Sequence, residues 1–147
     1  MKVYLDTSVI TIYLFGPYSK RENRRLPSVN ELFKRINEKH LHALISLYTL
    51  QEIYIFCKIH FATDEVGHIA KKALAFLFQN DFELIGLLSR EDHLIYNRQF
   101  NLDDPSDQPH AISAYPSKCD AIITYDTHFQ KIKDKIPAYT PEEAITK

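Results

Sequence analysis

Glycine and cysteine are both scarce in this chain. Its 147 residues include three glycines, at positions 16, 67 and 86, and two cysteines, at positions 57 and 119. The glycines form neither a GxGxxG turn nor a P-loop, which excludes the usual nucleotide-cofactor sites. The cysteines are isolated and form no CxxC pair, so we expect reduced thiols and a cytoplasmic location; a disulfide between them is the less favoured alternative.

Long apolar runs and an excess of charge are also missing. The first residues lack the apolar stretch of a signal peptide, and no later segment approaches the roughly 20 apolar residues of a membrane span. The formal net charge is -1, from 18 Lys+Arg and 19 Asp+Glu. A protein that grips long duplexes is usually basic, so this balance disfavours a bulk nucleic-acid binder more than a nuclease acting on a short single-stranded site.

What the chain does have is an alternation of strand and helix patterns. Short apolar strands are expected at 3–5, 43–45, 82–85 and 121–124, and helices at 8–14, from 28, at 46–60, from 63, from 89, at 107–115 and from 140. The second of these helices is expected to begin with a capping box, Ser28 to Glu31. The alternation predicts an α/β sandwich with a mostly parallel sheet, built as one domain over residues 1–147.

Four acidic residues follow predicted strands or lie near the starts of predicted helices: Asp6, Glu52, Asp107 and Asp126. Because parallel strands bring their carboxyl ends to one edge of a sheet, these acids are expected to converge there. A carboxylate cluster needs a compensating positive charge, and a hard divalent cation with oxygen ligands is the usual one. Such a cation on a phosphodiester activates water and stabilises the departing oxygen, which outlines a metal-dependent nuclease.

Each acid also has a purely structural alternative. Asp6, Asp107 and Asp126 are suited to begin helices, and Glu52 lies three residues after Thr49, the spacing of a capping box. Ser8 can cap the first helix instead, which would leave Asp6 free to point outward. His110 is expected to be a packing or surface histidine, with metal ligation as the minority interpretation.

Other residues remain candidates for supporting roles. Asp103 and Asp104 compete with Asp107 for a metal, and whether Asp120 joins the acids is left open. The basic run from Lys20 contains Arg21, Arg24 and Arg25, which is either a solvated loop or a set of groups that position substrate phosphates. The candidate ligands are oxygens without cysteines or paired histidines, so Mg²⁺ or Mn²⁺ is expected rather than Zn²⁺.

These motifs together resemble the PIN domain, and most closely the single-domain VapC-type ribonuclease toxins. The matching segments are Leu5-Asp6-Thr7-Ser8, Glu52 on an apolar helix, the run from Asp107 to Ala114, and the run from Ile123 to Phe129. The resemblance implies a PIN-like α/β/α fold with four to five strands. It also implies a Mg²⁺- or Mn²⁺-dependent endoribonuclease whose site is formed by the four acids, with Thr124 and Ser8 in support.

The resemblance further implies partners: an RNA substrate, a homodimer and a small antitoxin. A homodimer is also expected because Ile55, Phe56, Ile59, Phe76 and Phe78 give two helices more than one apolar face. Alternatives are a housekeeping RNA-processing nuclease of the same fold, or a binding module without catalysis. Two departures from the family pattern stand out: Pro109 within the helix-opening motif, and a long loop between Gly16 and Pro27.

Overall fold

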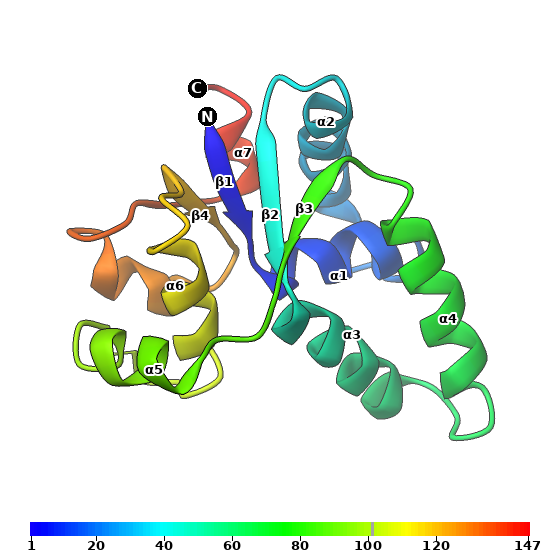
Figure 1. The fold of residues 1–147 in the computed structure, drawn as a ribbon. Coiled ribbons are helices and arrows are strands. Elements are labelled where there is room, and N and C mark those ends of the chain that lie inside the picture. Colours follow the sequence, from blue (N-terminus) through cyan, green and yellow to red (C-terminus); the bar gives the residue numbers. More distant parts are fainter. Residues whose placement is uncertain (101) are drawn as a thin grey trace.

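A five-stranded parallel sheet forms the centre of the molecule (Figure 1). The computed structural model describes residues 1–100 and 102–147. All neighbouring strands pair in parallel, in the order β3-β2-β1-β4-β5. The predicted sheet of four to five strands is therefore confirmed. The strands are β1 (Lys2–Leu5), β2 (His42–Ser46), β3 (Phe82–Ile85), β4 (Ala121–Ile123) and β5 (Ala138–Tyr139).

Helices cover both faces of this sheet, which gives the predicted α/β/α layering (Figure 1). The α-helices are α1 (Thr7–Phe15), α2 (Leu26–Asn37), α3 (Leu47–His60), α4 (Val66–Leu77), α5 (Arg90–Tyr96), α6 (Gln108–Ala114) and α7 (Pro141–Ala144). Three short 3-10 helices are η1 (Gly16–Tyr18), η2 (Glu22–Arg24) and η3 (Thr127–Ile132).

Strand residues alternate between two hydrophobic cores, because successive side chains of a strand point to opposite faces. In β1, Val3 and Leu5 belong to the core shared with α1, α2, α3, α4 and α7. Tyr4 points the other way, into the core shared with α6 and η3. All three side chains are fully buried. A sheet covered on both faces explains why its central strands are continuous apolar runs.

The strand order changes direction between β1 and β4. Polar side chains can come together at the carboxyl ends of these two strands. The chain builds β1, β2 and β3 outward on one side, then returns to add β4 and β5 on the other. Asp6 directly follows β1, and Thr124 directly follows β4. Ligands of open α/β sheets bind outside the carboxyl ends of the strands at such a switch point.

Local details differ from the sequence-based expectation at two places. Helix α2 begins at Leu26 with Arg25 as a cap that makes no side-chain bond, so the predicted capping box at Ser28 is wrong. Pro27 explains the earlier start, since proline is favoured in the first turn of a helix. The predicted loop after Gly16 contains η1 and η2.

Both cysteines, Cys57 and Cys119, are free. Within residues 1–100 and 102–147, no helix is long and apolar enough to cross a membrane.

Candidate metal centre

Asp6 is held at the carboxyl end of β1 by three hydrogen bonds to a single oxygen. Its Oδ2 accepts from the backbone N of Ser8 at 3.2 Å, from Oγ of Ser8 at 2.5 Å and from Oγ1 of Thr124 at 2.8 Å. The expectation that Ser8 caps α1 is wrong, because Asp6 is the N-cap and Ser8 donates to it. Within the described part of the chain, no hydrogen bond reaches Oδ1 of Asp6, so capping leaves one oxygen available to a ligand.

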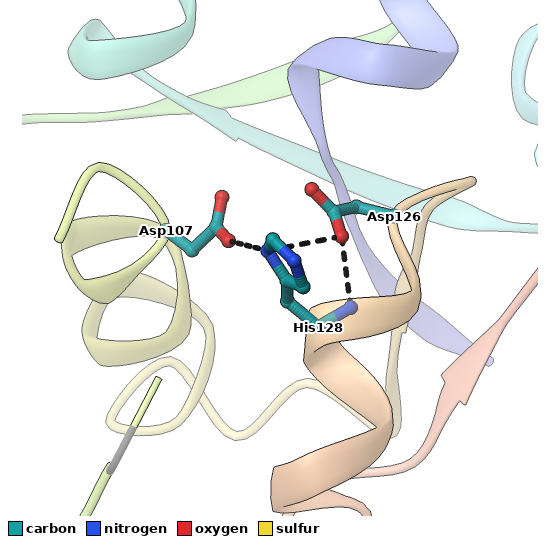
Figure 2. A group of neighbouring side chains, drawn as sticks. All are labelled: Asp107, Asp126 and His128. Carbon is teal, nitrogen blue, oxygen red and sulfur yellow. Dashed lines mark hydrogen bonds and ion pairs between the residues drawn. The ribbon is translucent and has the colours of Figure 1, made fainter. Parts of the chain in front are cut away.

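Asp107, Asp126 and His128 form a compact group beside Asp6. Asp107 stands at the N-cap position of α6 and Asp126 at that of η3. Figure 2 shows the imidazole of His128 between the two carboxylates, with Nδ1 3.3 Å from Oδ2 of Asp107 and 3.4 Å from Oδ1 of Asp126. One ligand atom from each residue lies within 4.8 Å of the others. Two carboxylates and one imidazole at this spacing can hold a divalent ion.

The electrostatics of Asp107 show how crowded the negative charge is. Burial, followed by the negative charge of Asp126, raises the pKa of Asp107 to about 6, and the charge of Asp6 adds to the effect. The hydrogen bond to His128 opposes this rise without cancelling it. Carboxylates that repel one another in this way are stabilised when a cation binds between them.

Glu52 lies in a separate, largely buried chain of hydrogen bonds. Its Oε2 accepts from Oγ1 of Thr7 and lies 2.9 Å from Nε2 of His110. The other nitrogen of His110, Nδ1, lies 2.7 Å from the hydroxyl of Tyr4, which lies 2.7 Å from Oγ of Ser46. The chain therefore joins α3, α6 and the two central strands, and it fixes the position of Glu52.

The charges of Glu52 and His110 support each other. Burial alone would raise the pKa of Glu52, but the hydrogen bond and the positive charge of His110 outweigh burial and lower it. Burial alone would lower the pKa of His110, yet the hydrogen bond to Glu52 and the surrounding carboxylates raise it. Both partners are driven toward their charged forms, which makes this an ion pair between a buried histidine and a partly buried glutamate.

Thr124 and Ser8 connect the acids. Oγ1 of Thr124 donates to Asp6 and accepts from the backbone N of Asp126 at 2.8 Å. Oγ of Ser8 donates to Asp6 and accepts from the backbone N of Tyr125 at 3.1 Å. These hydroxyl groups tie the carboxyl end of β1 to that of β4.

The structure thus brings all four predicted acids to one edge of the sheet, in two hydrogen-bonded groups. Asp104 is close enough for its charge to raise the pKa of Asp107, although its own Oδ1 is bonded to Ser106 at 2.8 Å. Asp103 pairs with Lys131. Asp120 lies at the opposite edge, where it accepts from the backbone N of Lys2 at 2.7 Å.

The three arginines predicted to contact phosphate are not equivalent. Arg21 and Arg25 line a cavity that also reaches Ser8, whereas Arg24 is not among its described lining residues. All three arginines are exposed.

Sequence reasoning missed His128 and underestimated His110. A search for paired histidines cannot find His128, because its partners are aspartates and one of them is only two residues away. The signal that was available is the spacing itself: a residue two positions after an N-cap aspartate can turn its side chain back to that carboxylate. His110 has no such local signal, since its partners Glu52 and Tyr4 are distant in sequence.

Comparison with known families gives one match over most of the chain. A family model described as PIN domain matches residues 2–128. The matched segment includes Asp6, Glu52, Asp107 and Asp126. Among proteins with a curated description, none matches this sequence.

Solved structures of toxin–antitoxin proteins have the same fold at low sequence identity. A chain of VapBC2 from Rickettsia felis, solved bound to a DNA fragment from its promoter, has a TM-score of 0.65 and 15% identity, covering 95% of this chain and 98% of that one. FitAcB from Neisseria gonorrhoeae has a TM-score of 0.66 and 16% identity, and the match covers 95% of this chain and 98% of that one. VapBC-1 from nontypeable Haemophilus influenzae has a TM-score of 0.58 and 19% identity, and the match covers 97% of this chain and 99% of that one. These likenesses confirm the PIN-like fold.

Proposed function

Because the chain belongs to the PIN domain family, we propose that it is a Mg²⁺- or Mn²⁺-dependent endoribonuclease that cleaves single-stranded RNA. The observation that carries this proposal is the group formed by Asp107, Asp126 and His128 beside Asp6, at the carboxyl ends of the paired strands β1 and β4, where the strand order reverses. This site offers two carboxylates and an imidazole within 4.8 Å of one another, and a third carboxylate with a free oxygen next to them.

The donor set fits a hard or borderline divalent cation. Carboxylate oxygens suit Mg²⁺ and Mn²⁺, and the imidazole nitrogen of His128 makes the set better suited to Mn²⁺ than an all-oxygen site would be. Asp107, Asp126 and Asp6 would hold the ion, with His128 as a further ligand. When bound, such an ion polarises the phosphodiester and lowers the pKa of an attacking water.

The remaining residues position these groups. Thr124 and Ser8 hold Oδ2 of Asp6, and no described residue forms a hydrogen bond to its other oxygen. His110 and Thr7 hold Oε2 of Glu52 in the same way, which leaves Oε1 to orient a water or a substrate hydroxyl. Fixing one oxygen of each acid limits the rearrangement needed when RNA binds.

We propose that the biological role is that of a toxin held inactive by a cognate antitoxin, acting in the cytoplasm as a homodimer. Support comes from the fold shared with VapBC and FitAB proteins. A housekeeping RNA-processing nuclease would have the same site and no antitoxin. A binding module without catalysis is disfavoured by the three ligand atoms that converge on one point.

Two measurements test the proposal. RNA cleavage by the purified protein should vanish in EDTA and return with Mg²⁺ or Mn²⁺, and full activity in EDTA would rule out the metal mechanism. Mn²⁺ binding, followed by electron paramagnetic resonance without RNA, should weaken in His128→Gln and be lost in Asp107→Asn. The control is His40→Gln, an exposed histidine after α2. Unchanged Mn²⁺ affinity in both site variants would place the metal elsewhere.

The antitoxin has its own test. Co-expression with the small protein encoded next to this chain should give a stable complex that suppresses cleavage. Cleavage without any such neighbour or complex would favour the housekeeping nuclease.

A further inference from the structure

A groove lined by rings and arginines opens beside the candidate metal centre. Its volume is about 490 Å³, and it lies between one side of α1, the end of α3 and the segment that contains η1 and η2. The sequence predicts a long loop over this segment. The residues that give the groove its chemistry are Tyr18, Arg21, Arg25, Phe56, His60 and Tyr125.

We propose that this groove binds one nucleotide of a single-stranded RNA, next to the phosphodiester at the metal centre. The inference rests on the proposed nuclease function and names the part of the protein that holds the flanking nucleotide. Its base would stack on the rings, and its phosphate would contact Arg21 and Arg25. Ligand sites of roughly 300–1,000 Å³ are typical of small-molecule pockets, so the groove is large enough for one nucleotide.

The rings supply flat surfaces of the kind that unpaired bases use. His60 is exposed and packs against Phe56 with ring centroids 4.2 Å apart and the ring planes tilted by 36°. The guanidinium of Arg25 lies over the ring of Tyr125, 4.4 Å from its centroid. Tyr18 is 87% exposed, with its ring available to solvent. Aromatic rings and guanidinium planes stack with bases of any sequence, whereas bases in a duplex are already stacked on each other.

The charge of the groove matches one phosphate. Glu22 pairs with both arginines, at 3.2 Å from Arg25 and 3.8 Å from Arg21. Two guanidinium groups against one carboxylate leave a net charge of +1. Glu22 thus pairs with the two arginines without cancelling their attraction for a phosphodiester.

The groove is continuous with the metal centre through two residues. Ser8 lines the groove and donates to Oδ2 of Asp6. Tyr125 lines it as well, and its backbone N donates to Oγ of Ser8. A strand whose base occupies the groove therefore has its next phosphate close to Asp6.

The test is RNA binding rather than cleavage. A labelled single-stranded RNA of about ten nucleotides is titrated by fluorescence anisotropy in EDTA, with the Asp107→Asn variant as the parent protein to prevent cleavage. Adding Tyr18→Ser should weaken binding about fivefold or more without changing its salt dependence. Adding Arg21→Gln should weaken binding and reduce the slope of log K against log salt by about 0.7, the value for one phosphate contact on a single strand.

Matched controls separate the groove from general attraction. Arg24→Gln, in the same basic run but outside the groove, and Tyr54→Ser, an exposed tyrosine of α3 outside it, should keep affinity and salt slope within about twofold. A duplex of the same sequence should compete poorly. The side chains changed in addition to Asp107 are all exposed, so melting temperatures should stay equal to that of the Asp107→Asn parent.

Specific outcomes would overturn the inference. Equal losses in Arg24→Gln and Arg21→Gln would mean diffuse attraction, and full affinity in Tyr18→Ser would mean that no base stacks there. Metal-dependent cleavage with RNA binding unaffected by all groove variants would leave the nuclease standing and refute the groove. If those variants impaired binding of a partner protein instead, the groove would be a protein interface. Absence of both cleavage and RNA binding would refute the proposed function itself.

Discussion

Nε2 of His110 lies 2.9 Å from Oε2 of Glu52, and His110 is only 1% exposed. The contact joins α6 to α3 across the carboxyl ends of the strands. Because His110 is also bonded to Tyr4, which is anchored to Ser46, this one imidazole connects four elements. These hydrogen bonds fix the position of the Glu52 carboxylate, in contrast to a surface acid whose side chain can move freely.

The first prediction concerns this pair. His110→Leu removes the partner of a partly buried carboxylate, and an unsatisfied group of this kind costs about 1–3 kcal/mol. The free energy of unfolding at pH 6 in EDTA, from urea denaturation, should fall by that amount. Glu52→Gln and the double variant complete a thermodynamic cycle. If the two single effects simply add in the double variant, the pair contributes no coupling and the prediction is wrong.

The second prediction is the pH dependence of the same pair. The raised pKa of His110 stabilises the fold below the ordinary value of 6.5, and this is lost as pH rises through the folded pKa. The lowered pKa of Glu52 stabilises the fold above pH 4.5, the ordinary pKa of a glutamate, and this stabilisation is lost as pH falls through the folded pKa. The stability difference between the wild type and His110→Leu should therefore be largest between pH 4.5 and 6.5. A difference that does not change with pH would contradict the ion pair.

The third prediction concerns Asp107. Its pKa is raised from 3.8 to about 6, so the metal-free fold loses stability as pH rises from 3.8 through about 6, and the loss is complete above that value. Asp107→Asn should therefore stabilise the metal-free protein at pH 7.5 by about 1 kcal/mol after allowance for partial solvation, and should have little effect at pH 4. Thermal denaturation in EDTA at the two pH values measures this.

Added metal provides the control for Asp107. Mg²⁺ or Mn²⁺ should raise the melting temperature of the wild type, because a ligand of the folded state stabilises it. It should not do so for Asp107→Asn. A variant that is less stable at pH 7.5 than the wild type, yet still stabilised by metal, would show that Asp107 is a structural cap.

Much of this arrangement follows from sequence patterns. The strand at Phe82–Ile85 is observed with its predicted bounds, and the apolar runs around Leu5 and Ile122 are buried strands. Short apolar runs that end in polar residues predict that the acids lie at one edge of the sheet. This prediction is possible because strand direction and side-chain alternation depend on the local sequence. The parallel sheet then brings residues as distant as Asp6 and Asp126 together.

Other features depend on contacts that no local pattern encodes. The buried position of His110 depends on Glu52 and Tyr4, which come from other elements. β5 has two residues, too few to show a period, and forms because β4 offers an unpaired edge. The sequence could not show whether Asp6 or Ser8 caps α1, because the choice depends on the hydrogen bond that Thr124, at the end of β4, donates to Asp6.

The fourth prediction separates the two roles of Asp6, as helix cap and as proposed metal ligand. Asp6→Asn keeps an oxygen that can accept from Ser8 and Thr124, so stability should change little, while cleavage and metal binding fall steeply. Asp6→Ala loses the cap as well and should cost about 1 kcal/mol more. Melting temperatures of both variants measure the role of Asp6 as a cap, and Mn²⁺ titrations measure its role as a metal ligand. Should Asp6→Asn keep full metal affinity and activity, Asp6 would be a cap alone.

The last prediction is that the chain forms a homodimer through α3 and α4. Phe56 stacks on Phe15 and is only partly exposed, so it leaves the apolar set expected from the sequence, whereas Phe76 stacks on Tyr13 and is still 46% exposed. Ile55 and Ile59 on α3, Phe76 on α4 and Phe78 directly after α4 remain exposed, Ile59 to 72%, and the two helices pack against each other. Exposed apolar side chains that form a continuous patch mark interaction surfaces, and we expect these four to contribute to one.

Sedimentation at micromolar concentration should give a dimer for the wild type and a monomer for Ile59→Asp, because a buried unpaired charge opposes association. The matched control is Leu94→Asp, which places the same charge on an exposed leucine of α5 and should remain dimeric. The opposite result, a dimer lost in Leu94→Asp and kept in Ile59→Asp, would move the interface to α5. A wild-type monomer would refute the dimer and leave the nuclease proposal untouched, since the residues proposed for the metal centre all come from one chain.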